Sequence, residues 1–500
     1  MSNLLSPLRR AASCFPDHVA VIDGEVSYTY AQTWDRCRRL LGVLHGLGLE
    51  RGDRVAIAAA NSHRYLELYQ TIAGAGLVMV PLNTRHALAE LRYALDDSGT
   101  KVLFTDLSVP DDLVERIVDV GAEDESSIAG TEPVDFPDDV AEADLAGLFY
   151  TGGTTGAAKG VMLTHGNLMA NTFHVMTMIP FSPATRWLVC SPLFHAAGSF
   201  AICSTVYHGG TQVVLPAFHP GAFLDLVERH GVTHSLAVPT MLAAIADEQQ
   251  ARPRDTGSMR YLTHGASPIA TEVVRRSTVA FPNATLMHLY GATETAPLAT
   301  ALVDEQLEID GPRARSCGRP VPGVEISIRD GERVCADGEV GEVCIRGANI
   351  MQGYWNKPAE TAAALPGGGW YRSGDLGYVA HDGCLFLVDR LKDMIVSGAE
   401  NVYSTEVEEV LSQHPGVLEC AVFGVPDDRW GEAVYAAVVP RSPEVTPEAL
   451  AAHCRERISG YKVPKTIEIR SEPLPKSGAG KILKRELRDP FWSGRSERIN

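Results

Sequence analysis

Paired cysteines, long apolar runs and a leader-like N-terminus are all missing from this 500-residue sequence. Its ten cysteines are scattered and no two have the C-x-x-C spacing, so zinc and thiol-redox motifs have little support. No apolar run reaches the about 18 residues that a membrane-spanning helix needs, and MSNLLSPLRR has no signal-peptide core. These absences predict a protein of the reducing cytoplasm, with most cysteines acting as small buried apolar residues.

Positive charge is also scarce, since 44 Lys+Arg stand against 62 Asp+Glu and the formal net charge is -18. This balance disfavours nucleic acid or an anionic membrane as the main partner, because both need a basic face. The charge is uneven. Residues 111–144 hold 13 acids and one arginine, which we interpret as a solvated surface helix and loop. Residues 461–500 hold ten bases against five acids and are the part suited to phosphate groups.

The composition is otherwise that of a globular protein, with 45% hydrophobic and 21% charged residues. Its length predicts two to four structural units. Short β-type runs alternate with stretches of helical periodicity, which predicts parallel βαβ units with sheets covered on both faces. The examples are strands at 54–60, 101–105, 211–216 and 233–239, and a helix at 30–48.

The texture changes after residue 315, where Gly- and Asp-rich turns separate short strands. That pattern is typical of antiparallel strands and favours a barrel-like region. A smaller α/β unit is predicted from residue 390, with helices near 404–413 and 446–458 and strands near 418–424 and 433–439.

The most informative motif is YTGGTTGAAKG at 150–160, which follows the apolar run LAGLF. Glycines let backbone N–H groups approach an anion, threonines add hydroxyl donors, and Lys159 adds a charge. The composition therefore indicates a phosphate-binding loop, with an ordinary Gly/Thr turn as the alternative. It is not a Walker loop, because Gly160 stands where that motif needs Ser or Thr.

Two further motifs pair a strand with a carboxylate. LYGATET at 289–295 offers the hydroxyl of Thr293 and the carboxylate of Glu294, a reasonable Mg²⁺ site since Mg²⁺ takes few protein ligands. WYRSGDLG at 370–377 offers Asp375, which suits the two hydroxyls of a ribose. A helix-capping threonine and a turn aspartate are the respective alternatives.

The last two motifs lie in the C-terminal quarter. VDRLKDMI at 388–395 packs four charges between apolar residues and falls at the predicted boundary of the smaller unit. LPKSGAGKILK at 474–484 places Lys481 on a Gly-rich turn that is able to bring it into a distant site. A solvated loop and a basic surface tail are the simpler interpretations of the two motifs.

In this order and at this spacing, the five motifs resemble the adenylate-forming (AMP-binding) superfamily of acyl-CoA synthetases, amino-acid adenylation domains and beetle luciferases. The resemblance runs from about residue 15 to 490. Supporting segments are PLNTR (81–85), PLFHAAG (192–198), GASP (265–268), GYW (353–355), SGAENVYSTEVE (397–408), GVPDDRWGE (424–432) and GYKVPK (460–465).

The resemblance implies an α/β fold. Its large N-terminal domain, residues 1–389, would comprise two stacked α/β subdomains and a β-barrel-like subdomain. A hinge at 390–393 would connect it to a small, mobile α+β domain at 394–500. The implied enzyme is an AMP-forming acid–thiol ligase. It would join a carboxylic acid to ATP and then pass the acyl group from the acyl-adenylate to the thiol of coenzyme A, with Mg²⁺ as the metal.

By resemblance, Thr151 and Glu294 are the magnesium-side residues. Lys481 bridges the carboxylate and the α-phosphate during adenylation, and Lys392 lies at the hinge. The cofactor-binding set comprises Thr151, Gly152, Gly153, Thr154, Thr155 and Lys159 at the phosphates, Gly265, Ala266, Ser267 and Tyr290 at the adenine, Asp375 and Arg390 at the ribose, and also Thr293, Lys392, Ser397 and Gly398. The catalytic set is Lys481, Glu294 and His195.

Four positions depart from the family's pattern. Gly152 replaces a hydroxyl residue, Ala158 and Ser404 each replace a common proline, and Ala399 replaces a common glycine. None of the four removes a charged catalytic group, although Ala399 would narrow the path expected for the coenzyme A thiol.

The acid substrate is less well defined. His195 is expected at the carboxylate end of the acyl pocket, with a packed histidine as the alternative. The small residues 196–199 after it predict an open apolar channel. This stretch has no aspartate for an amino acid's ammonium and no arginine for a second carboxylate. A medium- or long-chain fatty acid is therefore predicted first and an aromatic acid of the cinnamate or benzoate type second. A freestanding enzyme that loads a carrier protein, a silent ligand-binding relative and a homodimer all stay open.

Overall fold

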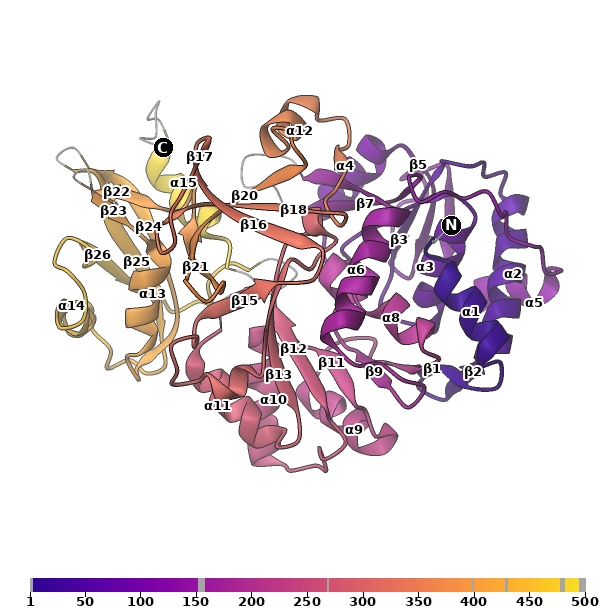
Figure 1. The fold of residues 1–500 in the computed structure, drawn as a ribbon, viewed down its shortest axis with the longest axis horizontal. Coiled ribbons are helices and arrows are strands. Elements are labelled where there is room, and N and C mark those ends of the chain that lie inside the picture. The colour runs from indigo at the N-terminus through magenta and orange to yellow at the C-terminus, as the bar shows by residue number, and fades with distance from the viewer. Residues whose placement is uncertain are drawn as a thin grey trace. The chain divides into compact units, whose positions relative to one another are not determined.

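The computed structural model describes residues 3–151, 158–267, 269–397, 400–427, 430–476 and 482–493. The chain forms two compact units, the first from Met1–Ile326 and Ile345–Arg372, the second from Ser327–Cys344 and Ser373–Asn500. Figure 1 shows the elements of both, coloured along the chain. The predicted boundary at residue 390 marks the hinge about which the C-terminal domain would move. The division into two compact units does not test that motion, so the boundary stays a prediction. No helix of the described ranges has the length and apolarity needed to cross a membrane.

The first unit contains a mainly parallel sheet whose carboxyl edge carries several predicted site residues. Six strands run parallel, while one strand at one edge and two at the other are antiparallel. In spatial order they are β15 (Ser316–Pro320), β14 (Thr300–Val303), β13 (Thr285–Tyr290), β12 (Tyr261–Gly265), β11 (His234–Leu236), β9 (Arg186–Val189), β10 (Thr211–Val214), β1 (Val19–Asp23) and β2 (Val26–Thr29).

Three amphipathic helices pack on this sheet. Phe223, Leu242 and Val274 from the helices meet Leu188 and Leu262 from the strands in one buried core. The helices are α9 (Pro220–His230), α10 (Pro239–Ala251) and α11 (Thr271–Ala280). Proline at the start of α9 and α10 is well placed, because the first helical N–H groups have no intrahelical acceptor.

The second sheet of the same unit carries the phosphate motif. Its five strands β6, β5, β3, β4 and β7 are parallel, and β8 and β19 continue it in antiparallel fashion. The order is β19 (Gly353–Tyr354), β8 (Lys159–Thr164), β7 (Leu145–Thr151), β4 (Val78–Pro81), β3 (Arg54–Ala58), β5 (Thr100–Thr105) and β6 (Arg116–Asp119). The strands predicted at 54–60, 101–105, 211–216 and 233–239 are thus confirmed, as is the helix predicted at 30–48, which is α2 (Tyr30–Gly46).

The first unit also contains the following helices, of which η1 and η2 are 3-10 helices of three residues each. They are α1 (Ser6–Cys14), α3 (His63–Gly74), α4 (Leu88–Ser98), α5 (Ala122–Gly130), α6 (His165–Met178), α7 (Ala196–Ser199), α8 (Ile202–Tyr207), η1 (Thr293–Thr295), η2 (Glu305–Leu307) and α12 (Pro358–Ala364). Helix α2 begins at a capping box, in which the side chains and backbone N–H groups of Thr29 and Gln32 satisfy each other.

The acidic stretch 111–144 contains the predicted surface helix, α5, and also a strand that was not predicted. It contributes β6, which pairs with β5, and it holds many of its acids against arginines of other segments. The ion pairs are Arg9–Asp138, Arg36–Glu125, Arg38–Asp135, Arg51–Asp139, Arg51–Asp144 and Arg92–Asp112. Charge patterning alone did not reveal these partners, because they come from residues up to 129 positions away in sequence.

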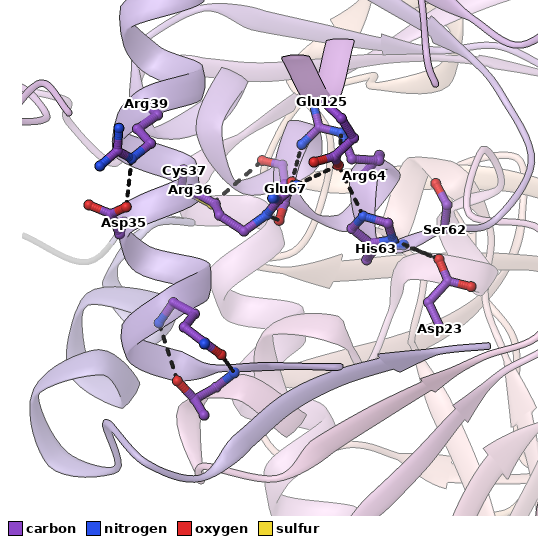
Figure 2. Close-up of polar contacts among 12 residues, drawn as sticks. Asp23, Asp35, Arg36, Cys37, Arg39, Ser62, His63, Arg64, Glu67 and Glu125 are labelled. Carbon is purple, nitrogen blue, oxygen red and sulfur yellow. Dashed lines mark hydrogen bonds and ion pairs between the residues drawn. The ribbon is translucent and has the colours of Figure 1, made fainter. Parts of the chain in front are cut away.

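Part of this stretch enters a buried group that we call the N-terminal ionic cluster, defined as Asp23, Arg36, His63, Arg64, Glu67 and Glu125. Figure 2 shows how α2, α3 and α5 meet there. Glu67 is 2% exposed and receives Arg36 through Nε and Nη2 and Arg64 through Nη1. His63 bonds Asp23 at 2.8 Å and Glu125 at 3.2 Å.

The second unit begins with antiparallel strands, as predicted for the region after residue 315. Their order is β17 (Arg333–Val334), β16 (Val324–Asp330), β18 (Gly341–Gly347), β20 (Trp370–Val379) and β21 (Leu385–Arg390), and the chain passes between the two units within β16, β18 and β20. Closure of these strands into a barrel stays a prediction.

A five-stranded sheet completes the second unit and has a core on each face. Its path is β23 (Glu400–Val402), β22 (Ile395–Ser397), β25 (Gly431–Pro440) and β24 (Val417–Asp427), with β26 (Thr466–Ile469) beside β25. Helices α13 (Ser404–Ser412) and α14 (Pro447–Arg455) pack on one face. Leu487 of α15 (Lys484–Trp492) packs on the other, with Phe423 and Tyr435. Alternate residues of a strand face opposite sides, so one sheet supports both cores.

All ten cysteines are free, and seven of them are buried. The expectation of small buried apolar residues therefore holds for most of them.

Candidate functional site

The parallel strands of the first sheet end at an edge where several predicted residues follow one another. His195 comes after β9, Gly265 ends β12, and Tyr290 ends the neighbouring β13. Gly265 pairs with Leu289, and a Cβ there would lie 2.2 Å from the Leu289 carbonyl oxygen, so only glycine fits. In open α/β sheets the carboxyl edge is where ligands bind.

The two residues after Gly265 are exposed to different degrees. Ala266 is exposed and has a positive φ of 66°, a backbone conformation rare for alanine. Ser267 is half-buried beside it. The turn they form at the strand end matches the position predicted for an adenine-binding segment, whose role stays a prediction.

Glu294 and Lys159 approach each other through a residue that the sequence analysis assigned no role. Tyr354 of β19 donates its hydroxyl proton to Glu294 Oε1 at 2.8 Å, and Lys159 Nζ lies 5.0 Å from the centre of the Tyr354 ring. Burial, and then the Glu294 carboxylate, raise the pKa of the Tyr354 phenol. A carboxylate, a neutral phenol and an ammonium group thus gather around the end of the phosphate motif.

The ends of the phosphate motif are well anchored. Thr151 of β7 stands opposite Lys159 of β8 in an antiparallel pair. Tyr93 donates to the carbonyl oxygen of Ala158 at 3.1 Å, and Tyr150 donates to Asp97 at 2.7 Å. The predicted phosphate-binding residues between the two strands, Gly152, Gly153, Thr154 and Thr155, lie outside the described residues.

The residues present suit Mg²⁺ better than a metal that needs a full protein cage. Across the described ranges, no group of three or more His, Cys, Asp and Glu side chains could hold a metal ion. Glu294 uses Oε1 for Tyr354, and its Oε2 has no partner within those ranges. One carboxylate oxygen, with hydroxyl, phosphate and water oxygens, is the type of ligand set that Mg²⁺ takes.

A buried asparagine holds the segment that carries Thr293 and Glu294. Asn349 is fully buried, and its Nδ2 donates to the carbonyl oxygens of Thr295 and Leu298, both at 2.8 Å. The backbone N–H of Met351 donates to the Glu294 carbonyl oxygen at 2.9 Å. Since these contacts fix the short 3-10 helix η1 from a distant segment, sequence spacing gave no sign of them.

A buried histidine–glutamate pair lies beside Gly265, and its histidine comes one residue earlier in the chain. His264 Nε2 is hydrogen-bonded to Glu305 Oε2, and the ring of His288 stacks on His264 at 4.9 Å. Burial lowers the pKa of His288 to about 4. Burial raises the pKa of Glu305, but the His264 hydrogen bond outweighs it and the net pKa is lowered. The sign of this pair in the sequence is a histidine near the end of each of two neighbouring strands. The sequence analysis assigned no role to either histidine.

His195 has the properties of a neutral hydrogen-bonding group. Burial, followed by the charges of His86 and Arg85, lowers its pKa to about 4. Its Nε2 is buried and has no partner among the described residues. The small size of Gly198 has a local cause, because a Cβ there would lie 2.0 Å from the Pro192 carbonyl oxygen. That glycine follows from a tight turn, so it gives no support to the predicted open channel.

The predicted ribose contacts lie in the second unit and touch each other. Asp375 of β20 stands opposite Arg390 of β21, and Arg390 Nε lies 2.6 Å from Asp375 Oδ1. Asp375 is buried, whereas the Arg390 side chain is 41% exposed, so the pair presents its guanidinium to solvent.

The hinge-side residues also fall in the second unit. Lys392 lies 3.8 Å from Asp393, and burial lowers the pKa of its ammonium group. Ser397 is buried in β22, opposite Gly431 of β25. Gly398 and Lys481 lie outside the described residues, so their predicted roles remain predictions.

Comparisons with known proteins show the family to which the chain belongs. The sequence model of the family described as AMP-binding enzyme matches residues 8–355, and that of the AMP-binding enzyme C-terminal domain matches residues 406–481. Feruloyl-CoA synthases of Amycolatopsis sp and Streptomyces sp are 41% identical over 97% of this chain and 98% of theirs. A long-chain-fatty-acid–CoA ligase of Mycobacterium tuberculosis is 32% identical over 98% of this chain and 99% of its own.

The solved structure of o-succinylbenzoate CoA synthetase from Bacillus subtilis, in complex with the acyl-adenylate OSB-AMP, has a TM-score of 0.89 and 30% identity over 98% of both chains. The predicted α/β fold with a large N-terminal and a small C-terminal domain is thereby confirmed, as is the prediction of an enzyme. The chain belongs to the family of AMP-binding enzymes.

Proposed function

We propose that this protein is an AMP-forming acid–CoA ligase whose substrate is an aromatic acid of the cinnamate type. It activates the acid with ATP to an acyl-adenylate and then passes the acyl group to the thiol of coenzyme A. The observation that carries the substrate class is the 41% identity to feruloyl-CoA synthases over 97% of the chain, against 32% for the fatty-acid ligase. The sequence alone favoured a fatty acid, so the proposed order of substrates is reversed.

The chemistry explains why positive groups belong at the site. A carboxylate is a poor nucleophile and is repelled by the triphosphate, so the enzyme must hold the two together and stabilise the charge that develops at the α-phosphorus. Lys159, fixed at the start of β8, offers an ammonium group for the β- and γ-phosphates. Lys481 is assigned to the carboxylate and α-phosphate by resemblance.

Glu294 and Thr151 would hold Mg²⁺, which when bound offsets negative charge on the phosphate oxygens. Tyr354 keeps one Glu294 oxygen in place through its 2.8 Å hydrogen bond and leaves the other oxygen for the metal side. Because the phenol stays neutral, it orients the carboxylate without adding charge.

His195 suits the carboxylate end of the acyl pocket. With its pKa lowered to about 4, the imidazole is neutral at pH 7 and is able to offer one N–H donor to an acid oxygen. A neutral donor orients the carboxylate and leaves its negative charge available for attack on ATP.

The proposal is tested with an acid panel under one set of conditions. Purified protein is given ATP, Mg²⁺ and coenzyme A with ferulate, cinnamate, benzoate, octanoate or palmitate, and coenzyme A-dependent AMP release is measured. The proposal expects the highest kcat/KM with ferulate or cinnamate. A higher value with octanoate or palmitate would replace the aromatic acid by a fatty acid. ATP–pyrophosphate exchange without coenzyme A-dependent AMP release would point to a carrier-protein acceptor.

The role of Lys481 is tested by separating the two half-reactions. A charge at 4 Å is worth about 4 kcal/mol at an effective dielectric near 20, or almost three decades in rate if it acts only in the transition state. We therefore expect Lys481→Ala to lower the rate of ATP–pyrophosphate exchange by almost three decades but to spare thiolysis of a supplied acyl-adenylate. Equal loss of both half-reactions would contradict this role.

A further inference from the structure

Helix α15 begins three residues after Lys481, and its surroundings are well defined. Just before it, Ile482 pairs with Lys476 in an isolated antiparallel bridge, and Leu483 N–H donates to the Pro475 carbonyl oxygen at 2.8 Å. Lys481 itself lies outside the described residues. The contacts described below belong to α15 and to the segments that it touches.

One face of α15 attaches it to the sheet of the second unit. Leu487 packs with Phe423 and Tyr435, and the ring of Phe491 lies 4.9 Å from that of Tyr435. The Trp492 indole N–H donates to the Gly424 carbonyl oxygen at 3.2 Å. Residues four apart share one helix face, so Leu487 and Phe491 account for this attachment together.

A different face of the helix contacts the hinge segment. Arg488, also buried, places Nη1 3.2 Å from Asp393 Oδ1 and 3.4 Å from the Lys392 carbonyl oxygen. Its side chain is 5% exposed and that of Asp393 is 11% exposed, so little water screens the pair. The guanidinium thus bonds both the backbone and the side chain of the predicted hinge.

Lys484, one turn earlier on the same face, reaches the residue before this segment through a serine. Its Nζ lies 2.7 Å from Ser404 Oγ and 2.7 Å from Glu408 Oε1. Ser404 in turn donates both its N–H and its hydroxyl to the carboxylate of Asp389, which immediately precedes the hinge. Arg488 therefore contacts the predicted hinge directly, and Lys484 on the same helix reaches the residue before the hinge through Ser404.

The serine is one of the positions at which this chain departs from the family's pattern. A proline at residue 404 has neither an N–H nor a hydroxyl, so neither bond to Asp389 would form, and Lys484 would lose one of its two acceptors. Because residue 404 opens α13, where proline is favourable, the bonds to Asp389 are not needed to start the helix. They are a property of this chain's hinge.

We propose that Arg488 and Lys484 are positioning residues, which fix the helix following Lys481 to the predicted hinge 390–393 and to Asp389 before it, so that hinge and lysine move as one body. The proposal rests on the proposed function, because it assigns Lys481 to the adenylation step. Arg488 and Lys484 act through the placement of Lys481 and touch no substrate themselves.

The kinetic test compares Arg488→Met with Arg485→Met. Arg485 lies on the same helix in an exposed pair with Asp489, which makes it the matched control. Arg488→Met is expected to slow ATP–pyrophosphate exchange by about tenfold to about a hundredfold, the usual cost of a misplaced reacting group. Thiolysis of a supplied acyl-adenylate should change little, and Arg488→Lys should restore part of the exchange. Equal losses in both half-reactions would overturn the proposal.

A second comparison separates positioning from general damage. In a Lys481→Ala background, Arg488→Met is expected to cause no further loss of residual adenylation, because there is no ammonium left to place. A further loss as large as in the parent would mean that Arg488 acts independently of Lys481, and would overturn the proposal.

A third readout needs no substrate and so stands even if the proposed acid is wrong. Amide hydrogen exchange of residues 389–393 is measured by mass spectrometry in the parent, Arg488→Met, Ser404→Pro and Arg485→Met proteins. We expect faster exchange in Arg488→Met and Ser404→Pro and no change in Arg485→Met. Unchanged exchange in the first two would overturn the link between α15 and the hinge, whatever acid the enzyme uses.

Discussion

Two ionic groups of this protein join segments that are distant in sequence. The pKa values of two carboxyl groups are lowered in the first group, and those of two carboxyl groups are raised in the second. In the N-terminal ionic cluster, burial raises the pKa values of Asp23 and Glu125, but hydrogen bonds from His63 and Arg36 outweigh it and both pKa values are lowered. In the group around α15, burial raises the pKa values of Asp389 and Glu408, and Lys484 offsets this only in part. We call this second group, Asp389, Asp393, Ser404, Glu408, Lys484 and Arg488, the α15 cluster.

The difference follows from how many cations face each carboxylate. Glu125 faces Arg36, Arg64 and His63, whereas Asp389 and Glu408 share the ammonium group of Lys484. A well-matched cluster anchors a segment firmly. A cluster short of positive charge holds its segment less tightly, which suits a link beside a hinge. The predictions below test this contrast.

The largest effect is expected from Glu67→Gln. The change leaves Arg36 and Arg64 buried with less opposing charge, and breaking a buried pair in this way costs about 3–5 kcal/mol. The free energy of unfolding, measured with urea, should fall by that amount. Asp112→Asn, in an exposed pair with Arg92, is the control and should leave the unfolding midpoint unchanged. A Glu67→Gln protein as stable as the control would mean that the cluster does not anchor the segment.

A smaller effect, of opposite sign in the two clusters, is expected on acidification. Lowered pKa values in Asp23 and Glu125 contribute stability that is present above the ordinary carboxyl pKa and is lost as pH falls through the folded-state values. Raised pKa values in Asp389 and Glu408 contribute stability that is present at low pH and is lost as pH rises through the folded-state values. Between pH 5 and pH 3, protection of α3 amides from exchange should fall relative to that of α15 amides.

The N-terminal cluster also has a response near neutral pH. Burial lowers the pKa of His63, but the hydrogen bond to Asp23 and the nearby carboxylates outweigh it, so the net pKa is raised. That contribution is complete below the ordinary histidine pKa and is lost as pH rises through the folded-state value. His63→Gln should abolish the decline in α3 protection above neutral pH. A decline that persists in His63→Gln would assign it to another group.

The smallest effect is expected from Glu408→Gln. The amide oxygen still accepts from the Val422 N–H and from Lys484, and the change removes a carboxylate that burial already disfavours. The expected loss of stability is below about 1 kcal/mol, the net value of one ordinary hydrogen bond. A loss as large as that of Glu67→Gln would show that the two clusters are equally well matched.

Local patterns predicted much of the fold. The parallel strands at 54–60 and 233–239 and helix α2 follow from apolar periodicity and capping, which depend on neighbouring residues. Strand β6 was missed because it has only two adjacent apolar residues between charged ones, and its stability comes from pairing with β5. Ion pairs such as Arg51–Asp144 join segments too distant in sequence for charge counting to connect them.

For the candidate site, too, local motifs could be predicted from the sequence, whereas contacts between distant segments could not. Motif order predicted ligand-binding roles for Lys159, Glu294, Asp375 and Arg390, and these roles stay predictions. The role of Tyr354 could not be predicted, because its contact with Glu294 joins β19 to the 3-10 helix η1, which follows a strand of another sheet. Spacing along the chain carries no information about which sheets meet.

The contrast between a structural and a functional cluster is tested most directly by one ratio, the rate of ATP–pyrophosphate exchange divided by the rate of thiolysis of a supplied acyl-adenylate. It is measured side by side in the parent, His63→Gln and Arg488→Met proteins, each at a temperature where it is fully folded. Our account predicts that the ratio falls in Arg488→Met and equals the parent value in His63→Gln. An unchanged ratio in Arg488→Met, or an equal fall in both variants, would contradict it.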